Sequence, residues 1–188
     1  MQLYVVRHGQ TDYNLENRYA GSTDVPLSAV GLQQAEQLAL RLRGTPMDIL
    51  VCSPLLRARQ TAAAVQAATG LPLVLAEAFA ERNLGLYEGR TRAQIQAELP
   101  ALWARNLLHQ ADDAPPGGES VRQFDARVTA GLEALHAAYA GQRVLLICHG
   151  YVSRLIHRYY HGLTYQEMNR FLLDNCEVAV YGAQAERL

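Results

Sequence analysis

Lysine is absent from this sequence. All 17 basic residues are arginine, and 18 acidic residues leave a formal net charge of −1. Without lysine the chain cannot form a Schiff base, use a lysine general base or build a phosphate-binding loop of the G-x-x-x-x-G-K-[ST] type. The near-neutral charge gives no reason to expect a nucleic acid or an anionic membrane as partner.

Cysteine and long hydrophobic runs are also scarce. The three cysteines, Cys52, Cys148 and Cys176, include no C-x-x-C pair and mostly have apolar neighbours, which predicts buried free thiols in a reducing compartment. No apolar run approaches the roughly 20 residues of a membrane span. The N-terminal residues lack a basic segment followed by a long apolar one, so we expect no secretory signal. These absences predict a soluble cytoplasmic protein.

The sequence that remains has the composition of an ordinary globular protein, with 49% hydrophobic and 19% charged residues. A length of 188 residues predicts a single domain over 1–188. Compact aliphatic runs at 3–6, 48–52, 71–75 and 143–148 are typical of strands buried on both faces. The run at 176–182 alternates and is typical of an edge strand.

Helical patterns separate these runs. Residues 29–43 place apolar side chains on one face, namely Leu32, Ala35, Leu38, Ala39 and Leu42. Ser53 is expected to cap a following helix. Capping boxes are predicted at Thr91, Ser120 and Thr164, each with Gln or Glu three residues later.

Strands that alternate with helices predict an α/β fold. We expect a three-layer sandwich: a mostly parallel central sheet with one antiparallel edge strand, and helices on both faces. Residues 79–119 are the least regular part and are predicted to form an excursion or lid over the sheet.

In open α/β sheets, ligands bind at the carboxyl ends of the strands. The first predicted strand runs into Arg7 and His8, the second is followed by Arg57, and the fourth by His149. Singly, such a histidine is more often a structural hydrogen-bonding group and such an arginine a surface ion-pairing residue. Together they indicate an anion site, because guanidinium forks match phosphate oxygens and neutral imidazole is a nucleophile near pH 7.

A glycine follows each histidine, Gly9 and Gly150, and allows the backbone to turn and a ligand to approach closely. A metal site is not expected, since no carboxylate or paired histidine motif lies near either histidine and two arginines would repel a divalent cation. The leaving oxygen of a phosphoryl transfer needs a proton. Glu77, Glu81 and Glu88 follow the third strand and are equal candidates on this reasoning.

Six motifs, in order, carry a resemblance to a known family: RHGQTDYN, AGSTDVPLSAVG, SPLLRARQTA, ERNLGLYEG, GGES and CHG. The chain resembles the histidine phosphatase family, which includes the cofactor-dependent phosphoglycerate mutases, from residue 4 to about residue 155. Within it, the chain is most similar to the branch of broad-specificity and alpha-ribazole phosphatases. The resemblance implies a phosphoglycerate mutase-like fold and no metal or other cofactor.

The resemblance also implies roles for individual residues. His8 would be the nucleophile that forms a phosphohistidine, and Glu81 would donate and accept the proton. Arg7, Arg57 and His149 would complete the catalytic phosphate pocket. The residues expected to bind the phosphate are Arg7, Gly9, Asn14, Gly21, Arg57 and Gly150. Glu88, in the same motif as Glu81, is expected to be structural.

Two positions depart from the family pattern. Ala20 stands where relatives often have glutamine, and Tyr151 stands where they often have a second glycine. The expected activity is metal-independent hydrolysis of a small-molecule phosphomonoester. A cofactor-dependent phosphoglycerate mutase and a catalytically inactive phospho-ligand binding module stay open as alternatives. The alternating edge strand also leaves a homodimer open. His109, His136, His157 and His161 are predicted to lie at or near the surface without partners.

Overall fold

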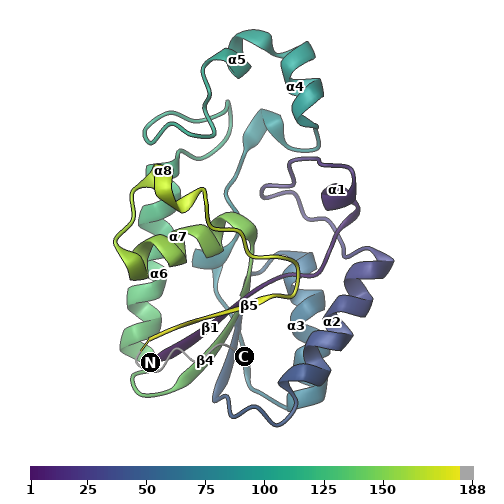
Figure 1. Cartoon of the computed structure of the whole chain (residues 1–188), viewed down its shortest axis with the longest axis vertical. Helices are drawn as coiled ribbons and strands as arrows, with labels where there is room; N and C mark the ends of the chain where they lie inside the picture. Colours follow the sequence, from purple (N-terminus) through teal and green to yellow (C-terminus); the bar gives the residue numbers. More distant parts are fainter. Residues whose placement is uncertain (183–188) are drawn as a thin grey trace.

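The computed structural model describes residues 1–182 and shows an α/β sandwich of three layers (Figure 1). The central sheet has five strands in the order β3-β2-β4-β1-β5. Their bounds are Gln2–Arg7 for β1, Ile49–Cys52 for β2, Leu73–Leu75 for β3, Arg143–Cys148 for β4 and Val178–Tyr181 for β5. All neighbours pair in parallel except β5, which is antiparallel to β1. The predicted fold class and edge strand are confirmed.

The two faces of the sheet bury alternate residues of each strand. In β1, Leu3 and Val5 face helices α6 (Val121–Ala138) and α7 (Gly150–His161). Tyr4 and Val6 face the opposite layer, made by α2 (Ala29–Leu42) and α3 (Leu56–Thr69), as Figure 1 shows. Complete burial of such an aliphatic side chain contributes about 1.5 to 3 kcal/mol. The central strands are therefore packed against helices on both faces, which fixes the position of their carboxyl ends.

Burial was predicted wrongly at two places. β3 lies at the edge of the sheet, and its Val74 and Leu75 are 41% and 52% exposed instead of buried. Leu32 of α2 was assigned to the apolar face but is 46% exposed. It falls in the first turn of the helix, whereas the four later positions of that face are buried.

The helix starts follow the predicted capping chemistry. Thr91, Ser120 and Thr164 each form a complete capping box, opening α4 (Arg92–Glu98), α6 and α8 (Tyr165–Met168). A further box between Thr11 and Asn14 opens α1 (Asp12–Leu15). The cap predicted at Ser53 is wrong, because α3 begins at Leu56 with Leu55 as its N-cap.

The segment between β3 and α6 carries short helices joined by chain without regular secondary structure. After η1 (Glu77–Phe79) and η2 (Gly85–Tyr87), α4 and α5 (Pro100–Ala104) lie at one end of the molecule, away from α6 (Figure 1). A small core of its own holds this part together, formed by Leu84, Tyr87, Ile95, Leu107 and Leu108. The buried Arg82 ties it to the chain before α6 by donating to the carbonyls of Leu108 and Glu119.

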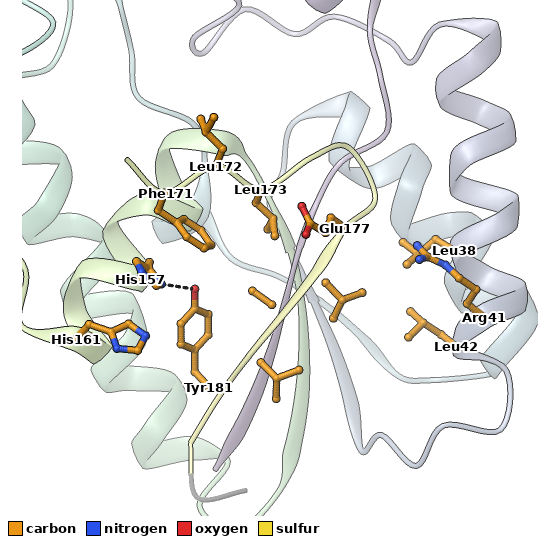
Figure 2. Close-up of a pocket in the computed structure, with 13 residues that line it drawn as sticks. Leu38, Arg41, Leu42, His157, His161, Phe171, Leu172, Leu173, Glu177 and Tyr181 are labelled. Carbon is orange, nitrogen blue, oxygen red and sulfur yellow. Dashed lines mark hydrogen bonds between the residues drawn. The ribbon is translucent and has the colours of Figure 1, made fainter. Parts of the chain in front are cut away.

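A hollow of about 700 Å³ lies beside β5 (Figure 2). In it the His157 ring stacks on Phe171 with centroids 4.0 Å apart, and its Nδ1 lies 3.2 Å from the Tyr181 hydroxyl. The Nε2 of His136 lies 2.9 Å from the Tyr160 hydroxyl. The prediction that these histidines lack partners is therefore wrong.

The structure also bears on the predictions of buried free cysteines and of no membrane-spanning segment. The three cysteines are buried and free, and burial raises the pKa of Cys52 to about 12. Within residues 1–182, no helix combines the length and the apolar character that crossing a membrane requires.

Candidate active site

The carboxyl ends of β1, β2 and β4 bring the predicted site residues together. His8 follows β1 directly and His149 follows β4, and their ring centroids lie 5.1 Å apart. Arg57, in the first turn of α3 after β2, donates from its Nε to the Nε2 of His8 at 3.2 Å. All three side chains are at least 96% buried, with exposures of 4%, 0% and 1%.

Hydrogen bonds fix the tautomer of His8. Its Nδ1 lies 2.6 Å from the carbonyl oxygen of Gly9, which can only accept, so Nδ1 carries the proton. Nε2 accepts from Arg57 and therefore keeps its lone pair. Burial, together with the charges of Arg57 and Arg7, holds the pKa of His8 well below its usual value. The ring is thus a neutral imidazole whose unprotonated nitrogen is Nε2, the atom that Arg57 contacts.

Arg57 is oriented by the loop that precedes α2. Its Nη1 donates to the carbonyl of Thr23 at 2.8 Å and its Nη2 to that of Gly21 at 2.7 Å. Glu88 holds this loop in turn, accepting from the backbone of Ser22 and from the hydroxyls of Ser22 and Thr23. The guanidinium is therefore set in one plane beside His8 before any substrate arrives.

Two buried polar atoms in the site have no hydrogen-bond partner among the described residues, Nε of Arg7 and Nδ1 of His149. Arg7 is held through its Nη1, which donates to the carbonyl of Leu173 at 3.0 Å. His149 is held through its Nε2, 2.7 Å from the Ser53 hydroxyl. Buried polar groups are rarely left unpaired, so these two atoms are the expected contacts of a bound anion.

Burial and nearby cations also lower the pKa of His149 well below its usual value; Arg57 is the largest charge effect, followed by His8 and Arg7. A dianionic phosphate among these groups would favour a protonated imidazole again. His149 is therefore suited to change protonation state when an anion binds.

The lowered pKa values of His8 and His149 predict how stability depends on pH. In the unfolded chain both rings take up protons as the pH falls through about 6.5, whereas the folded protein resists this until lower pH. The unfolded state then binds more protons than the folded state. The contribution of the two histidines to the free energy of unfolding is therefore fully present above about pH 6.5 and is lost as the pH falls below it. Two such groups give a slope of up to about 2.7 kcal/mol per pH unit.

Urea unfolding between pH 7.5 and 5 measures this slope. His8→Gln should reduce by about one the number of protons that the unfolded chain binds in excess of the folded chain. The slope should therefore fall by about 1.4 kcal/mol per pH unit. The partly buried His136, whose pKa is also lowered by burial, offers a matched control with a smaller effect. An unchanged slope in His8→Gln would contradict the buried neutral state of that ring.

Of the three candidate glutamates, Glu81 lies at the site. Its Oε2 accepts from the backbone N–H of Tyr151 at the start of α7 (3.1 Å) and its Oε1 from that of Arg82 (3.0 Å). Its charge raises the pKa of both Arg7 and Arg57, against the larger effect of burial. Glu77 is exposed, and Glu88 is engaged by the loop before α2.

The predicted phosphate ligands with no charge have varied surroundings. Asn14 uses its Oδ1 to accept from the Thr11 backbone at 3.0 Å, which leaves the amide donors for an anion. Gly9 donates its N–H to the Thr61 hydroxyl at 3.1 Å, and a Cβ there would lie 2.5 Å from the carbonyl oxygen of Gly31. The close approach that requires glycine at position 9 is thus made by α2.

The other two glycines border the charged groups. Gly21 has φ +50° and its Cα faces the Glu88 carboxylate, so a side chain there would be both strained and crowded. Gly150 opens α7 with its Cα toward Arg7; a Cβ would lie 3.7 Å from the Arg7 Nε.

Sequence reasoning missed two residues that hold the histidines. Ser53, expected to cap a helix, contacts His149 instead. Its position directly after the second strand was the available signal. Asn175 donates from Nδ2 to the carbonyl of His8 at 2.8 Å. It lies 167 residues away along the chain, and no local pattern points to it.

The two departures from the family pattern lie near this pocket. The Tyr151 ring packs beside the guanidinium groups of Arg154 and Arg82, 4.9 and 5.9 Å from its centroid. Ala20 precedes the loop that holds Arg57 and offers no side-chain polar group. Among residues 1–182, no cluster of three or more histidine, cysteine or acidic side chains is arranged to hold a metal ion.

The carboxyl edge of the parallel sheet thus brings together a buried imidazole, two arginines, a second histidine and a carboxylate, a set of groups that can bind an anion. The sequence model of the histidine phosphatase superfamily (branch 1) matches residues 3–188. The chain belongs to this superfamily and is an enzyme of it.

Individual relatives agree with this assignment. "Probable phosphoglycerate mutase GpmB" of Escherichia coli O1:K1 is 34% identical over 180 residues, covering 95% of this chain and 83% of the relative. The alpha-ribazole phosphatase of Shigella flexneri has a TM-score of 0.86 at 28% identity, covering 96% and 89%. A mycobacterial glucosyl-3-phosphoglycerate phosphatase in complex with VO3 has a TM-score of 0.85 at 30% identity, covering 95% and 90%.

Proposed function

We propose that this protein is a metal-independent phosphomonoester hydrolase that works through a phosphohistidine on His8. The observation that carries the proposal is the tautomer of His8, whose Nδ1 proton is held by the carbonyl of Gly9 while the unprotonated Nε2 accepts from the Nε of Arg57. The bond from Arg57 is given up when Nε2 attacks phosphorus. In the first step Nε2 attacks phosphorus and the ester P–O bond breaks. Glu81, protonated, gives its proton to the leaving oxygen.

In the second step water attacks the phosphohistidine. Glu81, now a carboxylate, takes a proton from that water, and the P–N bond breaks to release inorganic phosphate and restore neutral His8. Arg7, Arg57 and a protonated His149 hold the non-bridging oxygens in both steps. Catalysis is then mostly positioning and charge stabilisation in a buried site.

The pocket has donors for more than one phosphate oxygen. Nε of Arg7 and Nδ1 of His149 have no partner among the described residues, and the Asn14 amide keeps its donors. These groups come from three separate segments, so an anion would bridge them. The positive charges of Arg7 and Arg57 support a dianionic phosphomonoester as the substrate class, and the proposal needs no cofactor.

Hydrolase activity is favoured over mutase activity by the solved relatives named as phosphatases. The phosphoglycerate mutase name of GpmB keeps an isomerase as the second candidate. The discriminating experiment incubates EDTA-treated enzyme with 3-phosphoglycerate and a trace of 2,3-bisphosphoglycerate, and separately with a panel of phosphomonoesters including p-nitrophenyl phosphate. Phosphate release supports the hydrolase. Isomerisation without phosphate release would overturn it, and binding without turnover of any ester would indicate an inactive binding module.

A further inference from the structure

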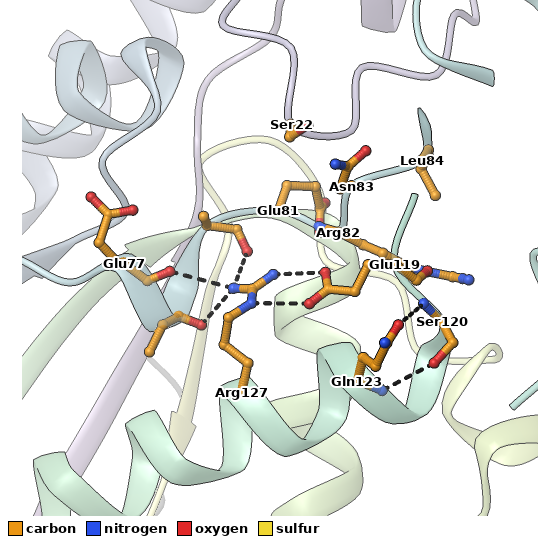
Figure 3. A network of polar contacts seen from close by, with 12 residues as sticks. Ser22, Glu77, Glu81, Arg82, Asn83, Leu84, Glu119, Ser120, Gln123 and Arg127 are labelled. Carbon is orange, nitrogen blue, oxygen red and sulfur yellow. Dashed lines mark hydrogen bonds and ion pairs between the residues drawn. The ribbon is translucent and has the colours of Figure 1, made fainter. Parts of the chain in front are cut away.

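Arg127 of α6 occupies a polar network beside Glu81 to which the proposed mechanism assigns no role (Figure 3). Its Nη1 lies 3.4, 2.9 and 3.0 Å from the carbonyl oxygens of Glu77, Ala78 and Ala80. Its Nε and Nη2 donate to the two carboxylate oxygens of Glu119 at 3.2 and 2.9 Å. One guanidinium thus holds the chain immediately before Glu81.

Glu119 holds the chain immediately after Glu81. Its N–H donates to the carbonyl of Asn83 at 2.8 Å, and its own carbonyl accepts from Nε of the buried Arg82 at 2.9 Å. Residues on both sides of Glu81 are therefore tied, through Arg127 and Glu119, to the same end of α6. Among residues 1–182, the hydrogen bonds to the carboxylate of Glu81 come from the backbone of Arg82 and Tyr151.

We infer that Arg127, paired with Glu119, is a positioning residue for the proton transfer that Glu81 performs. A general acid must lie within hydrogen-bond reach of the leaving oxygen, and loss of that placement removes its contribution, which is typically about 10²- to 10⁴-fold. Glu81 lies in residues 80–84, which have no regular secondary structure and join the short helices η1 and η2, so its position depends on these side-chain bonds. The inference rests on the proposed function, in which Glu81 protonates the leaving group.

A second route from Arg127 to the chemistry exists and makes a different prediction. The Arg127 charge is one of the weaker influences that lower the pKa of His149. An effect through His149 would act on the non-bridging oxygens and would lower the rate for all phosphomonoesters alike. An effect through Glu81 would depend on how much the leaving group needs a proton.

The experiment compares Arg127→Met on two esters, glycerol 2-phosphate, whose alkoxide leaves poorly, and 2,4-dinitrophenyl phosphate, whose phenolate leaves without protonation. We expect kcat/KM to fall about 30-fold for the first and less than about 3-fold for the second. Arg158→Met is the matched control. It removes another arginine–carboxylate pair, between Arg158 of α7 and Asp125 of α6, with side-chain exposures of 29% and 14% against 30% and 18% for Arg127 and Glu119. It should change both substrates by the same factor.

A double-mutant cycle separates positioning from general destabilisation. In a Glu81→Gln background, Arg127→Met should cause no further loss for glycerol 2-phosphate, because the group that it positions is already gone. Glu119→Gln is a milder change that keeps the carbonyl contacts of Arg127. It should lower kcat/KM for glycerol 2-phosphate about 5-fold and spare 2,4-dinitrophenyl phosphate. This variant replaces Arg127→Met in the test if Arg127→Met does not fold.

The outcomes distinguish this inference from the proposed function. Wild-type enzyme that hydrolyses neither ester would overturn the proposed function itself. Active wild-type enzyme with equal losses for both esters in Arg127→Met or Glu119→Gln, or an additive loss in the cycle, would overturn only the positioning role.

Discussion

His8→Gln is expected to lower kcat/KM for p-nitrophenyl phosphate by about 10⁴-fold or more, because it removes the nucleophile from an otherwise complete pocket. Glutamine fits the same buried space and can still accept a hydrogen bond from the Nε of Arg57, so the pocket should keep its shape. Its amide is not a nucleophile. The expected variant is therefore folded, binds anions and turns over almost nothing.

Two measurements check this result. Brief incubation with a ³²P-labelled ester, quenched in alkaline detergent, should leave label on the wild-type chain at His8 and none on the variant. Vanadate titration should show that the variant still binds an anion. His136→Gln is the control, since this histidine lies on α6, where its Nε2 contacts the Tyr160 hydroxyl, and should keep full activity. Normal turnover in His8→Gln would remove His8 from the mechanism.

Arg57→Lys is expected to lower kcat/KM by about 10³-fold, although the positive charge is kept. The guanidinium contacts His8, Gly21 and Thr23 through three different nitrogens, and its plane is set by them. An ammonium group is a single point charge on a flexible stem and cannot make this fork. The fall in kcat/KM of Arg57→Lys therefore measures the contribution of the guanidinium's planar geometry, because the positive charge is the same.

Arg57→Met removes the charge as well and adds a change in pH dependence. The Arg57 charge is the largest cause after burial of the lowered pKa of His8. Without it the pKa of His8 rises, so the acid limb of the kcat/KM profile should move to higher pH, whereas in Arg57→Lys it should stay near its wild-type place. Arg59→Met, an exposed change on the same helix, is the control. An unmoved limb in Arg57→Met would contradict the proposed coupling of these two groups.

The chemistry of the site follows largely from local sequence. His8, Arg57 and His149 could be predicted together because each follows a compact aliphatic run, and parallel strands bring their carboxyl ends to one edge. The three capping boxes were equally readable, since a cap depends on residues only three positions apart. Glu81 was not distinguishable from Glu77 and Glu88 without the family resemblance, because all three lie in one short segment.

Other features depend on contacts between distant segments. The exposure of Val74 and Leu75 depends on the place of β3 at the sheet edge, which hydrophobicity alone does not give. The Ser53 hydroxyl contacts His149 across 96 residues of chain instead of capping a helix. Glycine is required at position 9 because the backbone of Gly31 lies too close for a side chain.

Local sequence thus predicts which groups stand at the carboxyl edge of the sheet, because strand periodicity and strand ends are local properties. The protonation, tautomer and placement of these groups depend on contacts between distant segments. The tautomer of His8 needs Arg57, 49 residues away, and its low pKa needs the surrounding layers that exclude water. The placement of Glu81 needs α6 and α7. Proton positions and burial depend on what surrounds a group in space, and only the folded chain supplies those surroundings.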